Sequence, residues 1–194
     1  TARFEPSNVH EVIDPENKWL WRFSPKRLSA EQIRDAMLAV SGELRHRDGG
    51  AAQTSAVPVR SIYVKKMRNT PDRILQCFDS PSGFSSEPER LNTTTATQSL
   101  LLANSEWPLA RARAMAGRIL GGKENPSAED VAKAYRTAWG REASDAEVKA
   151  AVDFLAMQKT LTGEVLEKET IPKMSGLIAL GGCLAAAYSR IIFE

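Results

Sequence analysis

The chain has 194 residues, of which 42% are hydrophobic and 26% charged, and 26 basic against 24 acidic side chains leave a formal net charge of +2. This length can bury a core without disulfides or metals, and the composition excludes a disordered tail, a collagen and a disulfide scaffold. Because the charges nearly balance, they argue neither for nor against an acidic partner.

The first clear helix signal lies between Ser29 and Gly42. Ser29 and Gln32 have the spacing of a capping box, and apolar residues recur at helical spacing from Ile33 to Val40. Gly42 stands where a glycine commonly ends a helix. We therefore expect one helix here, with an apolar face.

The region after this helix is less regular. Residues 43–57 have no periodicity and include a Gly-Gly pair, which predicts a loop. The run of β-branched and aromatic residues over 57–64 predicts a short strand. A short helix is expected over 72–78, and the proline- and serine-containing segment 79–91 predicts a second loop.

The rest of the chain predicts further helices. Expected N-caps are Thr95, Ser105, Ser127 and Ser144, each followed by apolar residues at helical spacing. Together these signals predict a mainly α fold, a compact, bundle-like domain of six or seven helices with at most one or two short strands. Residues 1–194 are expected to form this single helical domain.

Targeting and membrane signals are weak. The opening TARFEPSN carries neither the basic segment nor the apolar core of a signal peptide. The most membrane-like stretch, 174–188, contains three glycines and is shorter than the about 20 apolar residues that a spanning helix needs. We expect a buried core helix there, and no membrane span in this chain.

The two cysteines, Cys77 and Cys183, lie in no CxxC, CxxCH or Cys/His cluster. Since structural zinc needs about four ligands and covalent haem needs paired cysteines, we expect no metal site and no cofactor in this chain. Two free buried thiols are the simplest interpretation. A disulfide between these cysteines is the alternative in an oxidising compartment.

The densest basic patch predicts one candidate binding surface, made of Arg60, Tyr63, Lys65 and Arg68. Basic side chains with an interleaved aromatic residue can hold nucleic-acid phosphates or an anionic polysaccharide. Because the overall charge is near neutral and no nucleic-acid motif is present, we expect no nucleic-acid partner. The structural alternative is a solvated strand end.

A polar stretch before the predicted helix at 95 gives a second candidate surface, made of Asn92, Thr94, Thr95 and Gln98. A helix N-terminus can bind an anion or a carbohydrate hydroxyl. The same side chains can instead satisfy the free N–H groups of the helix, which makes capping the structural alternative.

No catalytic constellation is evident, and we assign no catalytic residue. Neither His10 nor His46 has an evident partner for acid–base work, and Cys77 stands beside a carboxylate instead of a cation. An enzyme would need carboxylates such as Asp35 and Asp79 to converge in a cleft, roughly 5–10 Å apart. The structural alternative for Asp35 is an ion pair with Arg34 or Arg27.

Six segments, taken in order, resemble the planctomycete-type PSD domain (type one), a domain of unknown function. The resemblance spans residues 14–161, most of the chain. The segments are DPENKWLWRF (14–23), RLSAEQIRDAMLAVSG (27–42), VRSIYVKKMRN (59–69), FDSP (78–81), NTTTATQSLLLANSEW (92–107) and AYRTAWGREASDAEV (134–148).

The resemblance implies a setting and supplies no chemistry. Such domains typically lie at the C-terminal end of large exported bacterial proteins, downstream of a c-type cytochrome-like domain. This implies a periplasmic or cell-surface location, and a haem only in an upstream domain outside this chain. The family has no established catalytic residues that could be transferred to this sequence.

Residues and resemblance together favour a non-catalytic interaction or scaffold module of an exported, cytochrome-associated protein. Its partners would be the upstream domains of the same parent protein, with polysaccharide as a further candidate. The alternative function is a carbohydrate-binding or carbohydrate-processing domain that acts on complex polysaccharide.

Overall fold

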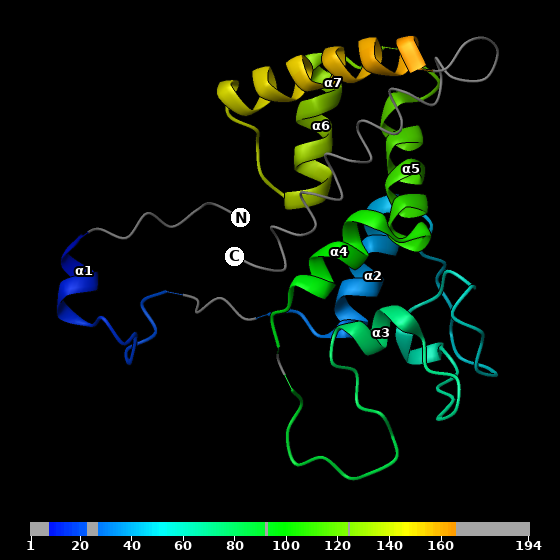
Figure 1. Ribbon diagram of the computed structural model, residues 1–194. Helices are drawn as coiled ribbons and strands as arrows, with labels where there is room; N and C mark the ends of the chain where they lie inside the picture. The colour runs from blue at the N-terminus through cyan, green and yellow to red at the C-terminus, as the bar shows by residue number, and fades with distance from the viewer. Residues whose placement is uncertain (1–7, 23–26, 92, 124, 166–194) are drawn as a thin grey trace.

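The computed structural model of the chain describes residues 8–22, 27–91, 93–123 and 125–165 (Figure 1). Within these ranges the fold is mainly helical and has no strand, which confirms the predicted mainly α class. The elements are α1 (Asn8–Ile13), α2 (Ala30–Ser41), the 3-10 helix η1 (Ser61–Tyr63), α3 (Arg73–Cys77), α4 (Ala96–Asn104), α5 (Glu106–Leu120), α6 (Ala128–Trp139) and α7 (Asp145–Val165).

Two sequence predictions lie outside the described residues: the core helix at 174–188 and the thiol of Cys183. Among the described residues, no helix is both long and apolar enough to cross a membrane.

Helix ends follow the predicted caps because the capping side chains satisfy backbone N–H groups that the helix leaves unpaired. In α2 the Ser29 backbone donates to Gln32 Oε1 at 2.9 Å, and Gly42 ends the helix with φ 79°. In α6 the Ser127 backbone donates to Asp130 Oδ2 at 2.9 Å, and Gly140 ends the helix with φ 65°.

The first hydrophobic core, here called the α2 core, gathers side chains from α2, α3 and α4. Helix α2 packs against α3, η1 and α5. Figure 1 shows α2, α3 and α4 grouped together below α5. The buried residues of the α2 core are Ala30, Ile33, Met37, Ile74, Phe78 and Leu102.

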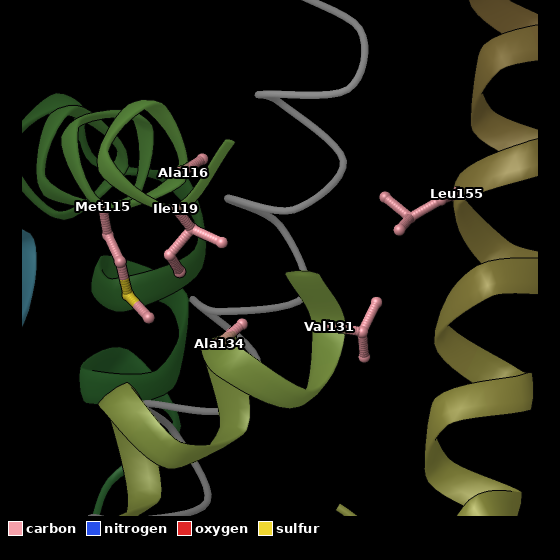
Figure 2. Close-up of a cluster of buried hydrophobic side chains, with 6 residues drawn as sticks. All are labelled: Met115, Ala116, Ile119, Val131, Ala134 and Leu155. Carbon is pink, nitrogen blue, oxygen red and sulfur yellow. The ribbon is translucent and has the colours of Figure 1, made fainter. Parts of the chain in front are cut away.

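The second core, here called the α6 core, lies between α5, α6 and α7. Figure 2 shows Leu155 pointing from α7 toward the side chains of the other two helices. Its buried residues are Met115, Ala116, Ile119, Val131, Ala134 and Leu155. Helix α5 reaches from the α2 core to the α6 core and so connects the two, whereas α1 lies apart from the other helices (Figure 1).

The prediction of a strand over 57–64 is wrong, because the structure has no strand there. Within this segment Ser61–Tyr63 forms a 3-10 turn, and only two isolated bridges involve it, Arg45 with Val59 and Gln53 with Val64. The reason is a buried side chain from α2. The Arg34 guanidinium donates to the carbonyls of Val59 (2.8 Å), Ser55 (2.9 Å) and Val57 (3.2 Å). Backbone oxygens that would otherwise need a neighbouring strand are therefore satisfied by this side chain.

Candidate functional site

A hollow of about 170 Å³ opens between the segment after η1, helix α3 and the loop that follows α3. We call it the basic hollow. Its apolar lining includes Val64, Met67, Leu75 and Phe84. Its cations are Lys65, Lys66 and Arg68.

Local hydrogen bonds hold the walls of the basic hollow in place. Gln53 N–H donates to the Tyr63 carbonyl at 2.8 Å, and Lys65 N–H donates to the Gln53 carbonyl at 2.7 Å. The opposite wall is α3, whose first N–H groups donate to the Asp72 carboxylate, from Ile74 at 3.0 Å and Leu75 at 3.1 Å. Ile74 is also buried in the α2 core, so the α3 wall is fixed to the body of the domain.

The two carboxylates of the basic hollow are already engaged. Asp72 caps α3, and Glu31 accepts a hydrogen bond from Arg90 at 2.6 Å. Burial alone would raise the pKa of Glu31, but the hydrogen bonds from Arg90 and the backbone outweigh it and hold that pKa below its ordinary value. Glu31 is therefore charged at neutral pH, and Arg90 balances it.

The three cations are not balanced in this way. Lys65, Lys66 and Arg68 are all exposed. Lys66 Nζ approaches Ser80 Oγ at 3.4 Å, and among the described residues none of the three forms an ion pair with a carboxylate. The basic hollow therefore presents uncompensated positive charge beside an apolar lining.

The predicted basic patch is divided between two places. Lys65 and Arg68 line the basic hollow, whereas Arg60 lines a shallower neighbouring depression, with its Nε 3.9 Å from Asp35 Oδ2. Tyr63 is half-buried and contributes its backbone carbonyl to the bond with Gln53.

The predicted polar surface at the start of α4 does not join the basic hollow. Asn92 lies outside the described residues. Thr94 Oγ1 accepts a hydrogen bond from Arg27 at 2.6 Å, and the Thr95 backbone donates to Gln98 Oε1 at 3.2 Å. Both threonines therefore interact with groups of the domain itself.

Gln98 is 0% exposed, and its side-chain amide is fully used. Its oxygen also accepts from Arg27 at 2.6 Å, and its nitrogen donates to the carbonyls of Cys77 (3.0 Å) and Thr93 (3.1 Å). Two accepted and two donated bonds complete the capacity of an amide. Gln98 thus joins α4 to the end of α3, and no group of its side chain remains for a ligand.

Asp35 and Asp79 have separate structural partners. Asp35 Oδ1 accepts from Ser61 N at 2.8 Å and from Ser61 Oγ at 2.7 Å, and it lies 3.5 Å from Arg34 Nη1. The predicted ion pair with Arg34 is therefore confirmed. Asp79 instead accepts from the backbone and hydroxyl of Thr93, at 2.7 and 2.9 Å.

The remaining reactive side chains are His46 and Cys77. His46 Nε2 lies 2.8 Å from Asp48 Oδ1, and the two side chains are 87% and 92% exposed, so water screens this pair. Burial, together with the charge of Asp79, raises the pKa of the Cys77 thiol, which favours the protonated and unreactive form. No cluster of three or more His, Cys, Asp or Glu side chains suited to a metal ion occurs in the part of the chain that the structure describes.

Sequence reasoning found the cations of the basic hollow but not its apolar lining. Leu75 comes from α3 and Phe84 from the loop 79–91, and only the packing of these segments brings them beside Met67. One signal was present in the sequence: Phe84 is a large aromatic residue in a loop otherwise rich in serine and proline. The structure leaves this side chain 68% exposed.

Comparison with known proteins identifies the family without supplying an activity. The chain matches PSD1, described as "Protein of unknown function (DUF1553)", over residues 2–155. No curated protein matches the chain, and no solved structure does. Because the match covers well over half of the 194 residues, the chain belongs to the PSD1 family.

Proposed function

We propose that this chain is a non-catalytic interaction module of a larger exported bacterial protein. The observation that carries this proposal is the basic hollow, where an accessible apolar lining adjoins cations with no carboxylate partner among the described residues. Such a combination favours recognition of another molecule, because covering the apolar area is favourable and the cations attract a partner of opposite charge.

Two carboxylates, Glu147 and Asp130, are suited to helix capping and not to acid–base work. A general acid or base works best with a pKa near the operating pH. Glu147 moves away from that range: hydrogen bonds from Arg141 and Ser144 lower its pKa to about 2. Burial would raise the pKa of Asp130, but hydrogen bonds from Ser127 and Lys123 outweigh it and lower that pKa. Both side chains cap helices.

The setting of the module is inferred from its family resemblance. A C-terminal position in an exported protein would place a c-type cytochrome-like domain upstream, at the periplasm or cell surface. The upstream domains are then the nearest partners, and any haem would be held by them. In this proposal the chain packs against those domains or presents them to a further partner.

The test is a titration of this chain with the separately produced remainder of its parent protein. Saturable binding is expected, together with a rise in the unfolding temperature of the chain, because a ligand that binds only the native state stabilises it. No association at about 0.1 mM of either partner would overturn the proposal.

Polysaccharide fragments, neutral and sulfated, provide the comparison in the same experiment. A saturable thermal shift with a glycan, and none with the parent remainder, would favour the carbohydrate-binding alternative. Turnover of that glycan would make the domain an enzyme and would contradict the non-catalytic assignment.

A further inference from the structure

We propose that the basic hollow binds an acidic peptide segment that carries an apolar anchor side chain, supplied by a partner polypeptide. This inference rests on the proposed interaction function and specifies its ligand. It joins three observations: the size of the basic hollow, the exposure of its apolar lining, and the presence of cations that form no ion pair with any described carboxylate, beside carboxylates that are already engaged.

The size of the basic hollow suits one apolar side chain. Its volume is about 170 Å³, and a cavity of roughly 150 Å³ accommodates a benzene-sized group. Met67 and Phe84 are 45% and 68% exposed, so this lining faces solvent until something covers it. A leucine or phenylalanine side chain would bury it.

The cations of the basic hollow, unpaired among the described residues, favour a negatively charged ligand. Glu31 and Asp72 are occupied by Arg90 and by the N-terminus of α3, so they do not neutralise the cations beside them. Lys65, Lys66 and Arg68 are exposed and lie within four consecutive residues. Carboxylates that flank the anchor side chain would complement them, and the planar guanidinium of Arg68 can hold one carboxylate by two hydrogen bonds.

A peptide fits these features better than a nucleic acid or a polysaccharide. Single-stranded nucleic acids stack successive bases on aromatic side chains, and Phe84 is the one aromatic residue among the described residues that line the basic hollow. The lining from Val64, Met67 and Leu75 is aliphatic. A charged polysaccharide carries anions but no aliphatic anchor, whereas a peptide can carry both within a few residues.

The experiment is a selection from a random peptide display library against this chain. Enriched peptides are expected to place acidic residues on one or both sides of a leucine, methionine or phenylalanine. A synthetic peptide of the enriched sequence should bind the double variant Lys65→Glu/Arg68→Glu about tenfold or more weakly than the original chain. Raising the salt concentration should weaken binding to the original chain, because its cations are exposed.

Two matched controls separate this site from general effects. Lys133→Glu/Lys149→Glu makes the same change in net charge at exposed positions of α6 and α7, and should leave binding unchanged. Phe84→Ser should weaken binding about fivefold or more, as expected for the loss of an apolar contact at an interface. Leu91→Ser should not, although Leu91 lies in the same loop and is 66% exposed against 68% for Phe84.

Several outcomes would overturn this inference. These are enriched peptides without acidic residues, enrichment equally strong on Lys65→Glu/Arg68→Glu, or no enrichment from a folded sample, including the case in which a sulfated oligosaccharide binds and no peptide is enriched. The proposed function fails separately. If the chain binds its parent remainder and the double variant binds it equally well, the interaction module stands and the role of the basic hollow is wrong.

Discussion

The α2 core and the α6 core are built from different kinds of contact. The α2 core buries large side chains such as Met37, Phe78 and Leu102, and two buried polar side chains beside it, Arg34 and Gln98, tie loops to helices. The α6 core is formed by side chains of three successive helices. Two of its six buried residues are alanines. The polar bonds of that half lie mainly at helix ends.

This difference shows which half of the molecule positions the candidate site. The basic hollow is made of segments next to the α2 core, and those segments keep their shape through Arg34 and Asp72. The α6 core stabilises helices whose ends are set by their own sequence. Changes in the α2 half should therefore disturb both stability and binding, and changes in the α6 half should disturb stability alone.

The largest expected effect comes from making the same substitution in both cores. Leu102, in the α2 core, is 0% exposed, and Leu155, in the α6 core, is 8% exposed. Leu102→Ala should lower the free energy of unfolding by about 4 kcal/mol, and Leu155→Ala by about 2 kcal/mol, because the cavity at the more enclosed site collapses less. Urea denaturation measures both. Equal losses would mean that the two cores are equally well packed.

The next largest effect tests the buried hydrogen bonds of Arg34 in the α2 half. Arg34→Met should lower the free energy of unfolding by about 3 kcal/mol, because the carbonyls of the 55–59 segment lose their buried donor. Arg73→Met, at an exposed position of α3, is the matched control and should change it by less than about 0.5 kcal/mol. A loss below about 1 kcal/mol for Arg34→Met would indicate that water replaces the guanidinium.

A pH titration tests the polar component of the α6 half. The pKa of Glu147 falls from 4.5 to about 2 in the folded state. Below pH 4.5 the unfolded chain therefore binds more protons than the folded chain, so the stabilisation is complete above pH 4.5 and is lost toward pH 2. The lowered pKa of Asp130 acts in the same direction.

The variant that isolates this effect is Glu147→Gln, which should lower the free energy of unfolding by about 1 kcal/mol at pH 7. Its deficit relative to the original chain should shrink as the pH falls from 4.5 toward 2, as followed by thermal unfolding. Glu129→Gln makes the same change of charge at an exposed position in the first turn of α6, without removing the bonds to Arg141 and Ser144, and is the matched control. A constant deficit at every pH would contradict the assignment.

The smallest expected effect is the difference between the two glycines that end α6 and α2. Gly140 has φ 65° and open space around it, so Gly140→Ala should lower the free energy of unfolding by about 1 kcal/mol through backbone strain alone. Gly42 has φ 79°, and an added Cβ would lie 2.7 Å from Arg118 Nη1, so Gly42→Ala should cost somewhat more. Thermal unfolding measures both, and equal losses would show that Arg118 moves away freely.

The sequence predicted the helices better than the segments between them, for a physical reason. A cap such as Ser29 with Gln32 acts within one turn, so its effect can be read locally. The 57–64 segment has the composition of a strand, but its carbonyls are bound by Arg34, more than twenty residues earlier in the chain. No local pattern reveals such a donor.

The candidate site was predictable to a similar degree. Lys65 and Arg68 stand in one short run and could be selected from their charge alone. Arg60 is separated from them because the 3-10 turn lies between and Arg60 lies beside Asp35 instead. This separation could not be predicted. Likewise, Leu75 and Phe84 reach the basic hollow only through tertiary packing.

The hydrogen bonds of Arg34 also have a kinetic consequence. The 55–59 segment has no regular secondary structure, and a segment of that kind usually opens locally and is cut readily by proteases. Here, opening would leave a guanidinium that is 1% exposed without its acceptors inside the α2 half. Local opening should therefore cost about as much as the loss of these bonds, about 3 kcal/mol, so these peptide bonds should be cut more slowly than those of an untethered loop.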